Sequence, residues 1–166
     1  SDDLANLYSA TDVRKTAVLQ LGTRASLPAW FVRKYLNIAT DRDDTKLIRL
    51  ADIYLIAAEA SAPVNETNAR TFLNFVATRR DASFTGYTST GAALVSDIIQ
   101  ERRKELAFEG DRFHDQNRLK QAIVRSTNFP AAARNIAYPF DKRLLPIPQV
   151  ETDANPTIKA QQNPGY

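Results

Sequence analysis

The chain has 166 residues, of which 43% are hydrophobic and 25% charged, and these proportions are typical of a globular domain with a sizeable core. The net charge of +3 is small and the acidic and basic residues are interleaved, which argues against a nucleic-acid-binding surface. No apolar run approaches the ~18 residues that a membrane-spanning helix needs. Cysteine is absent, which excludes disulfides and thiol chemistry. Methionine is also absent, even at position 1, so we expect the chain to be part of a longer protein.

The first part of the chain carries mixed patterns. Residues 2–8 predict a short helix, and residues 12–21 predict a helix that passes into a strand. A proline-containing loop is expected over residues 22–29, followed by a short aromatic strand over residues 30–35.

The middle of the chain predicts two helix pairs. Residues 46–62 are apolar on nearly all sides, which indicates a helix buried on more than one face, and residues 65–80 form the second helix of that pair. Residues 94–108 and 112–121 predict a second pair, with Gly110 ending its first helix. The pattern therefore favours a mostly α-helical fold of tetratricopeptide-like antiparallel pairs with long ordered loops.

The C-terminal part is marked by proline. Five of the eight prolines lie in the last 28 residues, and proline disfavours helix interiors. Apolar side chains persist between the prolines. We therefore expect an ordered, extended C-terminal tail that lies over the helices.

Three aromatic residues are candidates for ligand binding. Trp30 is the only tryptophan, and Phe84 and Tyr87 lie in the polar loop of residues 81–91. Each is interpreted either as a packing group at the edge of the core or as a platform on which a ligand ring stacks.

Charged residues on the helices predict a structural ion-pair lattice. Glu59 lies in an apolar helix, where a carboxylate without a partner would be costly. We expect the lattice to comprise Glu59, Arg102, Arg103, Glu105, Glu109 and Arg112. Acid catalysis by a glutamate pair would require one raised carboxyl pKa, whereas arginine neighbours lower carboxyl pKa values.

No catalytic, metal or cofactor site is expected. His114 is the only histidine, and the chain has no serine elbow, phosphate loop or pair of histidines at metal-ligand spacing. Asp41, Asp43 and Asp44 suggest a calcium loop, but Lys46 and Asp52 stand where that loop requires glycine and glutamate. A solvated loop is the better interpretation.

Three motifs, in order, resemble a known family. They are RLADIYLIAAEA at residues 49–60, ERRKELAFEGDRF at residues 101–113, and LLPIPQ at residues 144–149 with QNPGY at the end. From about residue 30 onwards, the chain resembles the C-terminal half of the SusD/RagB family of Bacteroidetes outer-membrane lipoproteins. It departs from the family at His114, where an aromatic residue is usual, and at residues 115–118.

The resemblance implies a function. Family members are non-catalytic, bind oligosaccharides or polysaccharide-derived nutrients at the cell surface, and deliver them to a SusC-like TonB-dependent transporter. Residues 1–166 would then form a single domain, the C-terminal portion of a larger protein. The N-terminal helical repeats, signal peptide and lipid-anchor cysteine of that protein would lie upstream. The matched motifs are scaffold motifs and identify no ligand residue. A helical-repeat module that binds proteins, without a small-molecule ligand, is the alternative.

Overall fold

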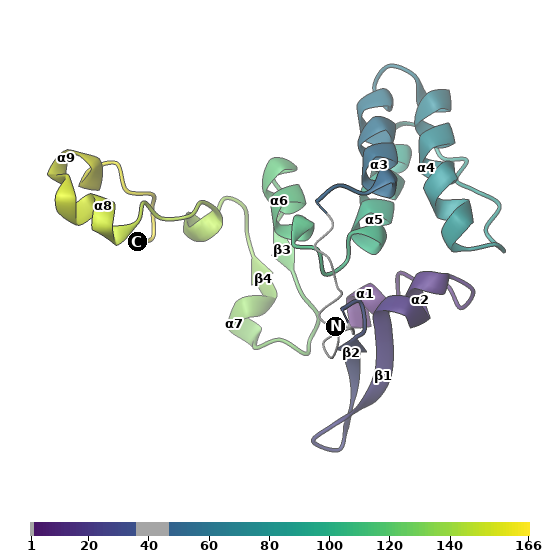
Figure 1. Ribbon diagram of the computed structural model, residues 1–166, viewed down its shortest axis with the longest axis horizontal. Helices are drawn as coiled ribbons and strands as arrows, with labels where there is room; N and C mark the ends of the chain where they lie inside the picture. Colours follow the sequence, from purple (N-terminus) through teal and green to yellow (C-terminus); the bar gives the residue numbers. More distant parts are fainter. Residues whose placement is uncertain (1, 36–46) are drawn as a thin grey trace. The chain divides into compact units, whose positions relative to one another are not determined.

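The computed structural model describes residues 2–35 and 47–166 of a mostly α-helical chain (Figure 1). The chain divides into two compact units, Ser1–Arg112 and Phe113–Tyr166. The predicted fold class is confirmed. The single domain over residues 1–166 stays a prediction.

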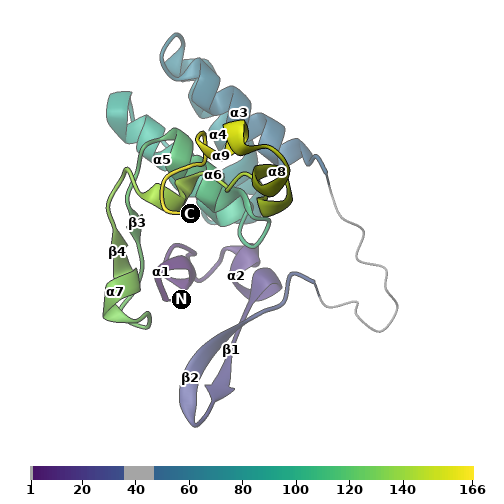
Figure 2. The same cartoon turned by 90° about the vertical axis from the view of Figure 1, so that its left-hand side faces the viewer.

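The core of the first unit is made by three helices. These are α3 (Leu50–Ser61), α4 (Glu66–Arg80) and α5 (Gly91–Glu105), which lie side by side in Figures 1 and 2. Their apolar faces bury one cluster, whose fully buried members include Leu55, Leu73, Leu94 and Ile98. The first of the two helix pairs expected from the apolar periodicity, α3 with α4, is therefore present, whereas the pairing of residues 94–108 with residues 112–121 stays a prediction.

The short connection between α3 and α4 is set by local chemistry. The side chain of Asn65 accepts a hydrogen bond from the backbone N–H of Asn68 at 3.0 Å and so caps the first turn of α4. Pro63 lies just after α3 and cannot continue the helix. The reversal of the chain brings α4 back along α3.

The end of α5 differs from its prediction. The helix was expected to continue to residue 108, but it ends at Glu105, and Phe108 and Gly110 both adopt positive φ, at 65° and 95°. The ammonium group of Lys34 donates to the carbonyl oxygen of Ala107 at 2.8 Å, so a cation occupies the C-terminal end of the helix. This contact involves a residue 73 positions earlier in the chain, and no local pattern predicts it.

The N-terminal segment holds two short helices and a β-hairpin. They are α1 (Asp2–Ala5), α2 (Val13–Val18), β1 (Leu19–Arg24) and β2 (Leu27–Val32). The loop predicted over residues 22–29 is wrong, because the two antiparallel strands are joined by Ala25 and Ser26 alone. Both of these residues have positive φ, at 48° and 63°, and neither is the asparagine or glycine that usually signals such a turn.

The second unit begins within α6 (Asp111–Arg118) and contains small elements. They are β3 (Ile123–Val124), α7 (Ala131–Arg134), β4 (Asn135–Ile136), the 3-10 turn η2 (Asp141–Arg143), α8 (Gln149–Ala154) and α9 (Pro156–Lys159). Strands β3 and β4 pair antiparallel, with Ile123 opposite Ile136.

The C-terminal tail is not extended throughout, as the prolines had suggested. Pro148 precedes α8 and Pro156 is the first residue of α9, positions where proline fits a helix because the missing N–H has no partner there anyway. The side-chain amide of Gln162 also exchanges two hydrogen bonds with the backbone of Ile147, at 2.8 and 3.0 Å. That the tail lies over the helices of the first unit stays a prediction.

Candidate functional site

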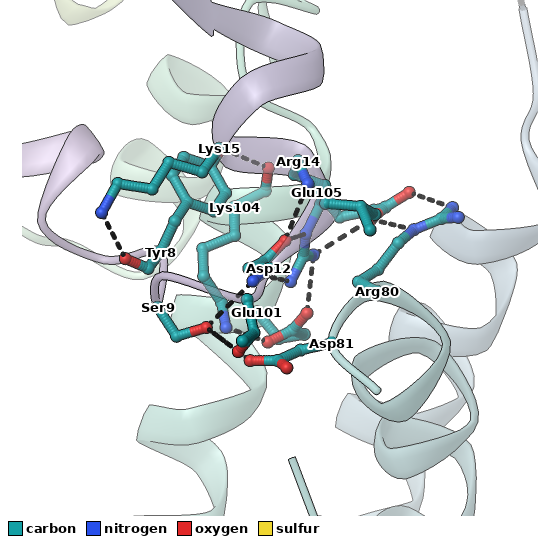
Figure 3. Close-up of polar contacts among 12 residues, drawn as sticks. Tyr8, Ser9, Asp12, Arg14, Lys15, Arg80, Asp81, Glu101, Lys104 and Glu105 are labelled. Atoms are coloured by element: carbon teal, nitrogen blue, oxygen red, sulfur yellow. Dashed lines mark hydrogen bonds and ion pairs between the residues drawn. The ribbon is translucent and has the colours of Figure 1, made fainter. Parts of the chain in front are cut away.

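Two carboxylates lie one helical turn apart on the buried side of α5. Glu101 is fully buried and Glu105 is 5% exposed. A carboxylate removed from water is costly unless ion pairs and hydrogen bonds replace its hydration. The partners come from distant segments of the first unit and converge on α5 (Figure 3).

Glu105 accepts hydrogen bonds from three arginines. Arg80, at the end of α4, binds both carboxylate oxygens, with its Nη2 at 2.8 Å from Oε1 and its Nε at 3.0 Å from Oε2. Arg49, just before α3, donates to Oε1 at 2.8 Å, and Arg14 of α2 donates to Oε2 at 3.1 Å. One side chain of α5 therefore connects α2, α3 and α4 through charge-assisted hydrogen bonds.

Arg14 joins Glu105 to the N-terminal segment. Its guanidinium group is buried, and it binds both oxygens of Asp12, with Nε–Oδ1 at 2.9 Å and Nη2–Oδ2 at 2.7 Å. Asp12 also caps α2 by accepting from the backbone N–H of Arg14 at 2.9 Å. The Asp12 carboxylate thus fixes both the start of α2 and the orientation of the arginine.

Glu101 pairs with the same arginine and with two further groups. Its Oε1 lies 2.7 Å from Nη1 of Arg14, an ionic contact in which no N–H points directly at the oxygen. Its Oε2 lies 2.5 Å from the Lys104 ammonium and accepts a hydrogen bond from the Tyr87 hydroxyl at 3.0 Å.

Glu109 extends the ion-pair network beyond the end of α5. It pairs with the ammonium group of Lys34, and its Oε1 lies 2.7 Å from Nη2 of Arg49. Because Arg49 contacts both Glu105 and Glu109, the turn after α5 is linked to the start of α3.

The ion pairs and hydrogen bonds around Glu101 and Glu105 shift the pKa values of the groups involved. Burial alone would raise the pKa of Glu105, but the hydrogen bonds from Arg80 and Arg49 and the charges of Arg80 and Arg14 outweigh burial and lower this pKa to about 2. Burial alone would lower the pKa of Arg14, whereas the hydrogen bonds to Asp12 and the charge of Glu101 raise it. Burial, together with the charge of Glu101, raises the pKa of Tyr87 above its ordinary value. Glu105 and Arg14 are therefore ionised at neutral pH, which suits a structural network better than a proton donor.

We expect low pH to lower the free energy of unfolding, because Glu105 becomes protonated. The pKa of Glu105 is about 2 in the folded chain against an ordinary value of 4.5, so its contribution to stability is complete above about pH 4.5 and lost as the pH falls towards 2. The loss should be about 3 kcal/mol, from about 1.4 kcal/mol per pKa unit. Urea denaturation at pH 7, 4.5 and 3 should show about 2 kcal/mol of this loss by pH 3, because the pKa in the folded chain is about 2. A Glu105→Gln variant should show a weaker pH dependence over this range, and an unchanged dependence would contradict the assignment.

A second polar cluster connects the N-terminal segment to the loop after α4. The Ser9 hydroxyl donates to Oδ2 of Asp81 at 2.5 Å, and the hydroxyl and backbone N–H of Ser83 donate to Oδ1 at 2.8 and 3.0 Å. The hydrogen bonds from Ser9 and Ser83 hold the pKa of Asp81 well below its usual range. Asp81 is consequently a weak base, poorly suited to activate the Ser9 hydroxyl.

The structure brings together some of the predicted lattice residues. Glu105 and Glu109 share Arg49, and Arg102 pairs with Asp52 of α3, with Nη1–Oδ1 at 2.8 Å. In the part of the chain that the structure describes, no ion pair of Arg103 is found. Glu59 is half-buried on α3, and Arg112 lies in the first turn of α6.

Sequence reasoning missed important members of the network. Arg14 and Lys34 were not selected, because their partners Glu105 and Glu109 are 91 and 75 residues away in the chain. Asp12, which pairs with Arg14, was missed together with it. The only local signal was the capping position of Asp12. Arg80 was not among the predicted lattice residues either.

Two of the three predicted ligand-binding aromatics are in contact. Phe84 and Tyr87 pack edge to face, with ring centroids 4.8 Å apart. Trp30 lies in β2, packs against the cluster of Ala5, Tyr8 and Leu19, and donates its indole N–H to Asp2 at 3.1 Å. Ligand binding by these residues stays a prediction.

Two observations concern only part of the chain. Asp41, Asp43 and Asp44, which suggested a calcium loop, lie outside the described residues. Over residues 2–35 and 47–166, none of the helices combines the length and the apolar character needed to cross a bilayer.

Comparison with known proteins identifies relatives that are longer than this chain. The chain is 29% identical to SusD-like protein P25 of Formosa agariphila over an alignment 185 positions long, which covers all of the chain and 34% of the relative. Its structure is similar to a SusD superfamily protein of Bacteroides thetaiotaomicron, with a TM-score of 0.84 and 32% identity over 99% of this chain and 40% of the other. A SusD-like carbohydrate binding protein of Bacteroides vulgatus matches with a TM-score of 0.76 and 26% identity over 92% of this chain and 39% of the other.

The chain thus spans between a third and two-fifths of the length of these relatives. The motifs at residues 49–60, 101–113 and 144–149 all fall within the region that the model of the SusD family matches, which is residues 29–166. Because this match covers most of the chain and the helical fold agrees with it, the protein belongs to the SusD family.

Proposed function

We propose that the protein is a non-catalytic glycan-binding component of the bacterial outer-membrane surface. In this proposal it captures oligosaccharides and delivers them to a SusC-like TonB-dependent transporter, and a lipid anchor upstream of this chain holds it at the membrane. The observation that carries the proposal is the structural likeness to the SusD-like carbohydrate binding protein of Bacteroides vulgatus.

The geometry of the first unit supports binding rather than catalysis. The buried carboxylates Glu101 and Glu105 are paired with cations, and the low pKa of Glu105 is the opposite of what a glycosidase acid requires. Recognition of a sugar needs instead an aromatic ring against its C–H face and hydrogen bonds to its hydroxyl groups.

The loop after α4 offers such a ring on a rigid backbone. Asn74 of α4 accepts from the backbone N–H of Tyr87 at 2.7 Å and donates to the Tyr87 carbonyl oxygen at 3.1 Å. Gly86 has a φ of 106°, and a Cβ at this position would lie only 3.0 Å from Asn74. The side-chain amide of Asn74 therefore holds the loop in one conformation, which reduces the entropy lost on binding. We propose Phe84 and Tyr87, together with Trp30, as ligand-binding residues.

Calorimetry with a panel of oligosaccharides, on the longer natural protein, tests this function. We expect Phe84→Ala to weaken the binding of the recognised sugar about five-fold, because an aromatic contact contributes about 1 kcal/mol. Tyr35→Ala is the control: Tyr35 is 49% exposed and is not one of the proposed ligand-binding residues, so its loss should leave the affinity unchanged. If no oligosaccharide binds the wild-type protein, the proposal fails.

Co-purification from detergent-solubilised membranes tests the partner. We expect a TonB-dependent transporter to be retained with the protein. Retention of a soluble protein instead, together with no sugar binding, would favour the helical-repeat module that binds proteins.

A further inference from the structure

Two arginines stand opposite each other where the loop between β3 and β4 begins and ends (Figure 1). The backbone N–H of Arg125 donates to the carbonyl oxygen of Arg134 at 2.8 Å, which continues the antiparallel pairing of Val124 with Asn135 by one residue. Side chains of residues paired in this way lie on the same face of a two-stranded ribbon, and two like charges there repel each other. The pair therefore lowers the stability of the hairpin unless an anion lies beside it.

Both charges lack a carboxylate partner. In the part of the chain that the structure describes, neither Arg125 nor Arg134 forms an ion pair. Residues 116–140 include no aspartate and no glutamate, so the hairpin cannot supply a counter-charge of its own. The arginines around Glu105, in contrast, are all paired with it.

Hydrogen bonds to the loop hold both guanidinium groups in place. Nη1 of Arg125 donates to the carbonyl oxygen of Ala133 at 2.6 Å. Arg134 donates through Nε to Phe129 and through Nη2 to Thr127, at 2.7 and 2.8 Å, again to carbonyl oxygens. A guanidinium group presents its N–H donors in a planar fork that matches the oxygens of a sulfate, phosphate or carboxylate group. The hydrogen bonds within the described residues use a minority of these donors, so most remain for a ligand.

An exposed aromatic ring lies beside the two cations. Phe129 is 39% exposed, and Cζ of Arg125 lies 5.4 Å from the centroid of its ring. The backbone of the same residue accepts the hydrogen bond from Arg134, so one phenylalanine contacts both arginines. The loop thus combines an apolar ring with two uncompensated positive charges.

We propose that the loop of residues 125–134 binds a saccharide that carries an anionic substituent, namely a sulfate, phosphate or carboxylate group. Arg125 and Arg134 pair with the oxygens of this group, and Phe129 lies against the C–H face of the sugar ring. The site belongs to the second unit and shares no residue with the aromatic residues proposed above. It is a further binding site, and only the choice of a saccharide rests on the proposed function.

A lipid headgroup is the less favoured source of the anion. Stable attachment to a bilayer requires a larger exposed apolar area, or a larger cluster of basic residues, than one phenylalanine and two arginines provide. A single sugar ring with one charged group, in contrast, matches the size of the loop.

Equilibrium dialysis with radiolabelled inorganic sulfate, on the longer natural protein, tests the anion site. We expect Arg125→Gln to weaken sulfate binding at least about ten-fold, the effect of losing one charge-assisted hydrogen bond. Arg125→Lys keeps the charge and should lose less. Arg24→Gln is the matched control, because Arg24 is an exposed arginine in the other β-hairpin, and its loss should leave sulfate binding unchanged. Absence of sulfate binding by the wild type, or equal binding by the wild type and Arg125→Gln, would overturn the proposal.

Calorimetry with sulfated oligosaccharides, each beside its desulfated form, identifies the source of the anion. We expect a sulfated form to bind at least about ten-fold more tightly than its desulfated form, and added salt to reduce this difference, because salt screens exposed charges. The difference should disappear in Arg125→Gln.

The remaining outcomes separate this inference from the proposed function. Equal affinities for the sulfated and desulfated forms would overturn the inference and leave the proposed function intact. If no saccharide binds, charged or neutral, the proposed function and the choice of a saccharide both fail. Binding to phosphatidylglycerol vesicles that is lost in Arg125→Gln, without any preference for sulfated saccharides, would assign the anion to a lipid and overturn the inference.

Discussion

Replacing Glu105 with glutamine should lower the free energy of unfolding by about 3–5 kcal/mol, the usual cost of removing one partner from a buried ion pair. Glutamine has nearly the same shape, so the loss comes from charge rather than from a cavity. Arg14 would remain 6% exposed with less negative charge around it, and Arg80 would lose its bidentate partner. Urea denaturation at pH 7 measures the change.

Glu66→Gln is the control for this substitution. Glu66 also lies on a helix and pairs with Arg70, but the pair is long, at 3.5 Å, and the glutamate side chain is 37% exposed. Its replacement should cost less than about 1 kcal/mol. Similar losses for the two variants would contradict the central role of Glu105.

Ligand affinity is a separate measurement. For the folded Glu105→Gln protein, and equally for the Arg102→Ala protein, we expect ligand affinity to stay unchanged, because these residues stabilise the fold through ion pairs.

Truncating the apolar core should cost a comparable amount. Leu73 of α4 is fully buried in the cluster with Leu55, Leu94 and Ile98. Leu73→Ala should lower the free energy of unfolding by about 2–5 kcal/mol, since both the transfer of the side chain and the cavity left behind contribute. Chemical denaturation, with the slope m as a check on two-state behaviour, measures the loss.

The same substitution on the exposed face of α3 is its control. Leu50 is 66% exposed, so Leu50→Ala in the 166-residue chain should change stability by less than about 0.5 kcal/mol. If both leucines cost the same, the division of α3 and α4 into a buried and an exposed side would be wrong.

The sequence by itself determined the α3–α4 helix pair and the family. Apolar residues at helical spacing over residues 46–62 and 65–80 predicted α3 and α4, and Asn65 marked the start of α4 as an N-cap residue. These signals are local: each depends on residues within one or two turns, so they can be read without knowing the fold. The family motifs can be recognised for the same reason, since each motif is a continuous stretch of the sequence.

The β-hairpin and the tail show where local signals fail. Ala25 and Ser26 form a tight turn without the residues that usually adopt positive φ, so the pairing of β1 with β2 must hold them there. In the tail, prolines indicated extended chain, yet Pro148 and Pro156 begin helices. Whether a proline ends a helix or starts one depends on the residues on its C-terminal side.

Only the tertiary structure decided which charges meet. Glu105 was recognised as a paired carboxylate, but its partners Arg14, Arg49 and Arg80 lie 91, 56 and 25 residues away. A buried carboxylate requires a cation, and composition shows that cations are present, but the choice among 22 lysines and arginines depends on which segments the apolar core brings together. Helical periodicity depends on residues that are close together in the sequence. The ion-pair network, in contrast, forms only after α2, α3 and α4 have packed against α5.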